Sequence, residues 1–213
     1  SQNCPLVILA CNTASAKALR NIQQRALPRM VPGLRVLGVI RPSVEMVAGI
    51  TRNGRVGVLG TPGTIGSLSY PIELEKWAGG KVKSTVQEAC PMWVPLVENN
   101  ELHSAGTDYF VEKHIRALLL KDPLIDTVIL GCTHYPLLID TIRKYLPGTI
   151  TLVDQGPVVA LKLKEYLTRH PEIDNRLSRN GIVRFLTTES AESFDSKAAL
   201  FMGKPVSATT ISL

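Results

Sequence analysis

The chain has 213 residues, of which 45% are hydrophobic and 20% charged, which is enough apolar material for one large domain or two small ones and too much for a disordered chain. No run of about 18 apolar residues exists, so the sequence predicts no membrane span. The formal net charge is +6, but the basic residues are dispersed and only 5% of residues are aromatic, which argues against nucleic-acid binding. We interpret the charge as a mild attraction for an anionic substrate.

The four cysteines are spread along the chain, at Cys4, Cys11, Cys90 and Cys132. They are too few and too scattered for a disulfide scaffold, which favours a reducing, cytoplasmic compartment. Zinc coordination is disfavoured because no two cysteines are separated by two to four residues, and Cys132 and His134 are too close to serve one site together. We therefore expect no metal, and we interpret Cys4 and Cys90 as small core residues.

Short apolar runs alternate with helical patterns along the chain, which predicts an α/β protein with parallel strands. We expect strands at 6–10, 35–40, 55–60, 81–90, 126–131, 149–153 and 182–186. We expect helices at 14–26, 43–51, after residue 64, and at 108–120, 137–146, 158–168 and 192–202.

Two of these segments repeat one arrangement around a cysteine. Residues 8–13 read Ile-Leu-Ala-Cys-Asn-Thr, and residues 129–134 read Ile-Leu-Gly-Cys-Thr-His. Each pattern predicts a cysteine between the end of a strand and the start of a helix, where open α/β sheets bind ligands. The partial positive charge of a helix N-terminus lowers the pKa of a thiol and binds carboxylates. The sequence therefore predicts two reactive thiols, Cys11 and Cys132, each beside an anion-binding corner.

Two opposed thiols suit proton transfer at a tetrahedral carbon. Removing a Cα proton from one face and returning a proton to the other needs two acid/base groups on opposite sides of the substrate. The reaction predicted from Cys11 and Cys132 is thus racemisation or epimerisation. We expect no cofactor, because the sequence has no glycine-rich dinucleotide fingerprint, no Walker loop and no distinctive lysine for pyridoxal phosphate.

Residues 10–16, Ala-Cys-Asn-Thr-Ala-Ser-Ala, and residues 130–138, Leu-Gly-Cys-Thr-His-Tyr-Pro-Leu-Leu, resemble the two signature motifs of bacterial glutamate racemase, in the aspartate/glutamate racemase superfamily. The segments 38–42, 60–64 and 89–91 resemble further family segments in the expected order. The resemblance spans nearly the whole chain.

This resemblance implies two pseudo-symmetric α/β lobes, with mainly parallel sheets flanked by helices and the active site between the lobes. The first lobe would be discontinuous, formed by 1–36 and 153–213, and the second would be 37–152. The implied activity is cofactor-independent interconversion of L- and D-glutamate for peptidoglycan synthesis, in the cytoplasm. Glutamate would be the only partner required, with no nucleic acid and no membrane, and a homodimer is compatible with the resemblance.

The resemblance also assigns roles to residues of the two motifs. Cys11 would serve one face of the substrate Cα and Cys132 the other. Asn12, Thr13 and Thr133 would hold the carboxylates and the ammonium group of the substrate.

Four further residues are candidates by the same resemblance, each with a plain structural alternative. Thr61 and Thr64 would bind substrate, although helix capping and turn chemistry explain both residues equally well. His134 would assist the thiol of Cys132, or would be a structural histidine. Glu98 would support His134, or would be a solvated glutamate at a helix end.

The sequence departs from the family pattern before the first cysteine. Family members carry there a glycine-rich turn with an Asp-Ser pair and then a Tyr-Gly pair, and neither stands before Cys11. We expect the 213 residues to be a piece of a longer protein and, alone, to be weakly active or inactive. Two alternatives are an aspartate-type racemase and a catalytically dead binding or regulatory protein, the second disfavoured by the presence of both thiols and His134.

Overall fold

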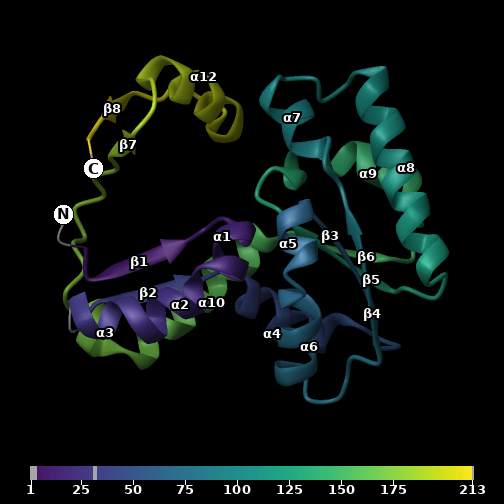
Figure 1. Ribbon diagram of the computed structural model, residues 1–213, viewed down its shortest axis with the longest axis horizontal. Coiled ribbons are helices and arrows are strands. Elements are labelled where there is room, and N and C mark those ends of the chain that lie inside the picture. The colour runs from purple at the N-terminus through teal and green to yellow at the C-terminus, as the bar shows by residue number, and fades with distance from the viewer. Residues whose placement is uncertain (1–3, 31–32, 213) are drawn as a thin grey trace.

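The computed structural model describes residues 4–30 and 33–212, and in this part of the chain the strands form three parallel sheets (Figure 1). The α/β class expected from the sequence is confirmed. The first sheet pairs β1 (Leu6–Leu9) with β2 (Arg35–Gly38). Four short elements connect these strands: α1 (Asn12–Lys17), α2 (Leu19–Asn21), the π-helical turn η1 (Ile22–Ala26) and α3 (Leu27–Met30). The helix expected over 14–26 thus begins two residues earlier and is broken by a π-helical turn.

The second sheet is the centre of the molecule and has the strand order β4-β3-β5-β6. Its strands are β3 (Arg55–Gly60), β4 (Ser84–Ala89), β5 (Thr127–Gly131) and β6 (Thr151–Val153). All five residues of β5 are buried. Such an almost continuous buried run is typical of a parallel strand that helices cover on both faces.

Helices cover the two faces of this sheet with separate apolar clusters. One cluster joins the sheet to α7 (Trp93–Glu98), α8 (Ala105–Lys121), η2 (Tyr135–Leu138) and α9 (Ile139–Tyr145). The other joins it to α4 (Ile40–Ile50) and α6 (Ser69–Trp77), with α5 (Pro62–Gly66) preceding α6. Parallel pairing brings the carboxyl ends of β3 and β5 to the same edge, with Gly60 opposite Gly131.

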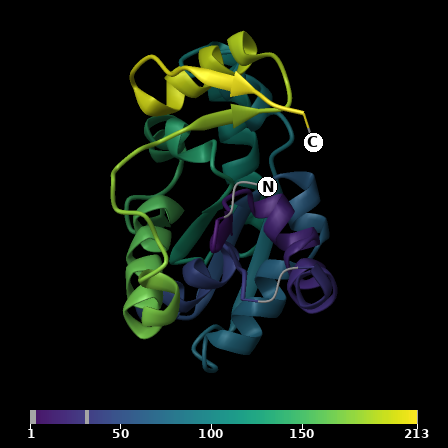
Figure 2. The same ribbon diagram turned by 90° about the vertical axis from the view of Figure 1, so that its left-hand side faces the viewer.

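The last part of the chain crosses back towards β1 and β2 and then moves away. Helix α10 (Gln155–Arg169) packs against α4 and is followed by α11 (Pro171–Asp174). The third sheet pairs β7 (Phe185–Thr187) with β8 (Ala208–Thr210), on either side of α12 (Ala191–Met202). Both views place this unit apart from β1 and β2 and beside the α7 end of the molecule (Figures 1 and 2).

Several elements differ from the sequence predictions. Helices α7 and α11 and strand β8 were not expected, and the strand expected at 182–186 is displaced to β7 because Ile182 and Val183 are exposed. Within the described residues, β7 and β8 share no strand pairing with β1 and β2. The division into lobes at 1–36, 37–152 and 153–213 therefore stays a prediction. No helix in the described part of the chain is long and apolar enough to cross a membrane.

Candidate active site

The two predicted thiols follow the carboxyl ends of parallel strands, as the repeated pattern indicates. Cys11 comes two residues after β1, is exposed and is the N-cap residue of α1. Cys132 comes directly after β5 and is buried, with 8% of its surface exposed. One detail of the prediction is wrong: Cys132 does not begin an α-helix, because a turn and the 3₁₀ helix η2 separate it from α9.

The surroundings of Cys132 favour the protonated thiol. Burial raises the pKa of Cys132 to about 11, the backbone N–H of His134 lowers it in part, and the charge on Cys11 raises it further. The expected lowering of this pKa is thus wrong for Cys132, because desolvation outweighs the single hydrogen bond from the turn. The influence of Cys11 on this pKa also indicates that the two thiols face a common region.

A chain of polar side chains leads away from Cys132. His134 Nδ1 lies 3.9 Å from the Sγ of Cys132, and His134 Nε2 lies 3.1 Å from Oε1 of Glu98 at the end of α7. The other oxygen of Glu98 is 3.0 Å from Nζ of Lys197 on α12. These contacts bring the predicted residues Glu98, His134 and Cys132 together in one line.

Lys197 and Phe201 complete this line and were missed by the sequence analysis. Hydrogen bonding to Lys197, and more weakly to His134, holds the pKa of Glu98 below its usual range against the opposing effect of burial. The Phe201 ring packs edge-on against the His134 ring, with centroids 5.0 Å apart. The spacing of four residues between Lys197 and Phe201 puts both on one helix face, which was the only available signal.

The three other predicted threonines meet at the edge where β3 ends. Thr13 Oγ1 lies 2.9 Å from Oγ1 of Thr61 and 3.0 Å from Oγ1 of Thr64. Thr61 also caps α5 by accepting a hydrogen bond from the N–H of Thr64, so the capping alternative is confirmed for this residue. The cluster joins α1 to α5, and a Cβ at Gly63 would come within 2.9 Å of Thr13 Cγ2.

Asn12 and Thr133 occupy contrasting positions. Thr133 is exposed, with its hydroxyl 3.4 Å from Nδ1 of His134. The Asn12 side chain is only 3% exposed and hydrogen-bonds Tyr70 and Gln155. A substrate-binding role for both residues stays a prediction, and Asn12 has a structural connection that the sequence did not suggest.

The remaining two cysteines have different outcomes. Cys90 is buried in the core beside Trp93 and Tyr135, which confirms its interpretation, and burial raises its pKa well above the usual value. Cys4 is exposed at the start of β1, so its interpretation as a core residue is wrong.

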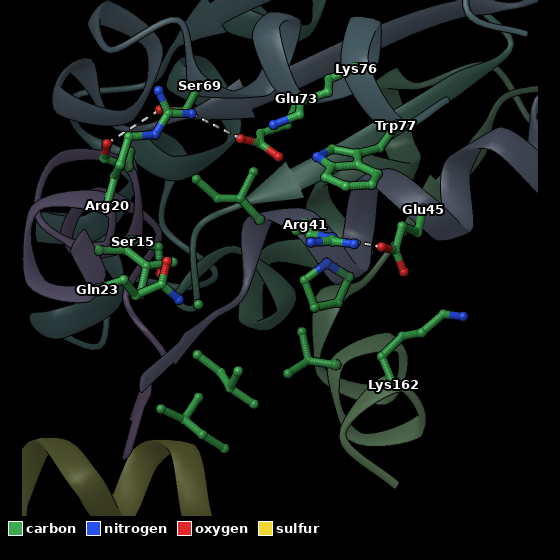
Figure 3. Close-up of a pocket in the computed structure, with 18 of the residues that line it drawn as sticks. Ser15, Arg20, Gln23, Arg41, Glu45, Ser69, Glu73, Lys76, Trp77 and Lys162 are labelled. Carbon is green, nitrogen blue, oxygen red and sulfur yellow. Dashed lines mark hydrogen bonds and ion pairs between the residues drawn. The ribbon is translucent and has the colours of Figure 1, made fainter. Parts of the chain in front are cut away.

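A cavity of about 900 Å³ lies between α1, α4, α6 and α10 (Figure 3). Its wall includes Arg41, whose guanidinium lies 3.6 Å from the centre of the Trp77 ring and pairs with Glu45. Arg20 and Glu73 face each other across another part of the wall. The described residues that line it include neither Cys11 nor Cys132, so the cavity is separate from the thiols.

Comparison with known proteins agrees with this geometry. A family model described as Asp/Glu/Hydantoin racemase matches residues 1–162. The chain belongs to this family. A glutamate racemase of Persephonella marina is 37% identical over 201 residues, which are 94% of this chain and 70% of that protein. One of Chlorobaculum parvum is 35% identical over 198 residues, which are 93% of this chain and 69% of that protein.

The fold places the chain in the same family. The crystal structure of a glutamate racemase isoform of Bacillus anthracis has a TM-score of 0.83 at 33% identity, over 98% of this chain and 74% of that one. The segment that matches the racemase family model contains Cys11, Glu98, Cys132 and His134, whereas Lys197 lies beyond it.

Proposed function

We propose that this chain catalyses cofactor-independent racemisation of glutamate, with Cys11 and Cys132 as the two acid/base groups. The observation that carries the proposal is the placement of both thiols after parallel strands, close enough to influence each other's ionisation. Membership of a racemase family and about 35% identity to glutamate racemases over nine-tenths of the chain support the same reaction and substrate. The product would supply peptidoglycan synthesis.

Each turnover moves one proton off the substrate and one onto it. A thiolate removes the Cα proton from one face, and the electron pair left on the carbon is stabilised by the substrate carboxylate. The opposite thiol then donates its proton to the other face, which inverts the centre and exchanges the protonation states of Cys11 and Cys132. The high pKa of Cys132 suits the donor in one direction, and its deprotonation for the other direction requires a nearby base.

His134 and Glu98 provide that base. His134 would take the proton of Cys132 through Nδ1, and the resulting imidazolium would be stabilised by the Glu98 carboxylate. Lys197 keeps this carboxylate ionised. Cys11 is more exposed and lies outside this line of contacts, so the two thiols would be activated differently.

The threonine cluster and the two motif turns would hold the substrate charges. The hydroxyls of Thr13, Thr61 and Thr64 now bond one another and would exchange these contacts for a substrate carboxylate. Fixed donors of this kind lower the barrier because they are already oriented when charge develops on the substrate. We also retain as proposals the contribution of Asn12 and Thr133, the two-lobe division, the homodimer and the cytoplasmic location.

Proton exchange at Cα tests the proposal directly. The chain is incubated with D-glutamate in D₂O, the Cα proton is followed by NMR, and the product enantiomers are separated. We expect loss of the Cα signal together with formation of L-glutamate. Because wash-out accumulates with time, the assay also detects the weak activity expected from the sequence. No exchange by a chain that circular dichroism shows to be folded would overturn the proposal.

A further inference from the structure

Three buried side chains form a closed ring of hydrogen bonds behind Cys11. The Asn12 Nδ2 donates to Gln155 Oε1 at 2.7 Å, and Gln155 Nε2 donates to the Tyr70 hydroxyl at 2.8 Å. The Tyr70 hydroxyl in turn donates to Asn12 Oδ1 at 2.8 Å. The exposed fractions are 3%, 8% and 0% for Asn12, Gln155 and Tyr70, so solvent does not compete for these bonds.

Only one arrangement of the donors satisfies this ring. The second hydrogen of Gln155 Nε2 is used by Ser43 Oγ at 2.7 Å, and Ser43 donates to the backbone oxygen of Val39. Turning either amide over would place donor against donor or acceptor against acceptor. Hydrogen bonds that run in one direction around a ring also polarise and strengthen one another. The ring therefore fixes the orientation of all three side chains.

The ring joins elements that the chain brings together from distant parts of the sequence. Asn12 begins α1, Gln155 begins α10 where the chain crosses back from the central sheet, and Tyr70 lies on α6. The residue before α6, Leu68, has a φ of 56°, in the left-handed region. Such a conformation persists only where the surrounding structure requires it. It provides the turn that leads the chain into α6.

Tyr70 also reaches the second cysteine-bearing turn. A Cβ added to Gly131, the residue before Cys132, would lie 3.1 Å from Cε2 of the Tyr70 ring and 2.9 Å from the backbone oxygen of Leu59. Glycine is therefore needed at 131 for this close approach. One side chain thus bonds the residue after Cys11 through its hydroxyl and packs against the residue before Cys132 with its ring.

We propose that Tyr70 and Gln155 are positioning residues that set the orientation of Cys11 relative to Cys132. The inference rests on the proposed function, because a two-thiol racemisation requires both sulfurs to face one Cα at the same time. An apolar core would fill the same volume without a preferred orientation, whereas buried polar groups that satisfy one another specify a single arrangement. The ring gives Asn12, and with it the turn of Cys11, one defined position against the central sheet.

The test substitution is Tyr70→Phe, which removes one oxygen and keeps the ring packed against Gly131. The matched control is Tyr145→Phe on α9, which removes a hydroxyl that bonds Asp108 at the surface. Both are assayed with each glutamate enantiomer in D₂O, and the ratio of Cα wash-out to inversion is compared with the unsubstituted chain. We expect Tyr70→Phe to lower the kcat for inversion by about 10- to 100-fold with less than a threefold change in KM.

The ratio separates positioning from plain loss of structure. A smaller folded fraction would lower wash-out and inversion equally, whereas misplaced thiols still remove a proton but fail to return one to the other face. We therefore expect the ratio to rise at least fivefold in Tyr70→Phe and to stay constant in Tyr145→Phe. Gln155→Leu should behave like Tyr70→Phe because it opens the same ring. An unchanged ratio in both ring variants would overturn the inference.

A second readout does not depend on activity. The chain is treated with a short bifunctional thiol reagent, and the peptide that links Cys11 to Cys132 is quantified by mass spectrometry. We expect Tyr70→Phe to change the rate of this cross-link at least threefold relative to Tyr145→Phe. If the unsubstituted chain exchanges no proton but the cross-link rate changes as expected, the proposed function fails and the positioning by the ring stands. Equal cross-link rates would overturn the positioning itself.

Discussion

The turns of Cys11 and Cys132 resemble each other in sequence and differ in their surroundings. Each cysteine follows a parallel strand and precedes small hydrogen-bonding residues. Cys132 ends a wholly buried strand of the central sheet and is backed by His134 and Glu98, whereas Cys11 is exposed after the partly exposed strand β1. A repeated local pattern thus produces the same backbone arrangement twice, while packing from distant segments decides how each thiol ionises.

The largest effect is expected from removing either thiol. Cys11→Ser and Cys132→Ser should each lower inversion in both directions by about 10³-fold or more, because a hydroxyl is a far weaker acid than a thiol. Each variant should still wash out the proton on the face served by the remaining cysteine, starting from only one enantiomer. Chiral separation with NMR in D₂O measures both. Wash-out from both enantiomers in one variant would contradict the one-thiol-per-face arrangement.

The raised pKa of Cys132 predicts slow alkylation. With a pKa of about 11, the thiolate fraction at pH 7–8 is about 100-fold smaller than for a thiol of pKa 9. The alkylation rate by iodoacetamide, followed by peptide mass spectrometry, should rise with pH up to about 11 in the folded chain. In urea the half-maximal pH should fall to the ordinary value, because unfolding removes the burial that raises the pKa. The half-maximal pH is used because it is independent of access to the sulfur.

The same difference couples ionisation to stability. Between the unfolded and folded pKa of Cys132, the folded chain binds more protons than the unfolded chain, so its free energy of unfolding decreases as pH rises through this window. Cys132→Ser should flatten this part of the pH dependence, while Cys11→Ser provides the matched comparison. Urea unfolding at pH 8 and pH 10 under reducing conditions measures the difference.

The sequence predicted much of the site because its signals are local. A buried strand, a cysteine and a His-Tyr-Pro turn lie within residues 127–136, and the pattern places them without knowledge of the rest of the chain. Lys197 and Phe201 could not be found in this way, since their partners Glu98 and His134 are far away in the sequence. Only the packing of α12 against the end of α7 brings them together.

The ring around Asn12 escaped the sequence analysis for a related reason. Asn12 stands in a motif that suggests an exposed donor, but its amide is held by Tyr70 and Gln155, which lie 58 and 143 residues away. Neither partner has a local pattern that distinguishes it from an ordinary core tyrosine or a helix N-terminal glutamine. Likewise, the exposure of Cys4 depends on what packs over the start of β1, which local patterns do not contain.

The line behind Cys132 predicts a smaller and one-sided effect. Glu98→Gln keeps the shape of the side chain and removes the charge that would stabilise protonated His134. We expect wash-out on the Cys132 face to fall by about tenfold, while wash-out on the Cys11 face stays within about twofold. Rates measured from the two enantiomers separately make this comparison. Equal losses on both faces would show that Glu98 supports the fold as a whole and not the Cys132 side of the site.

Lys197→Ala should have the smallest effect, and its signature is a shift in pH dependence. The contact between Lys197 and Glu98 is partly exposed, so we expect less than a threefold change in the rate at neutral pH. Hydrogen bonding to Lys197 is the main cause of the low pKa of Glu98, so its removal should raise this pKa towards the usual value. Because Glu98 must be ionised to stabilise protonated His134, the acidic limb of the Cys132-face rate should move to higher pH. Lys144→Ala, which removes a comparable exposed pair with Asp108, should leave that limb in place. An acidic limb that coincides in Lys197→Ala, Lys144→Ala and the unsubstituted chain would separate Lys197 from the chemistry of Cys132.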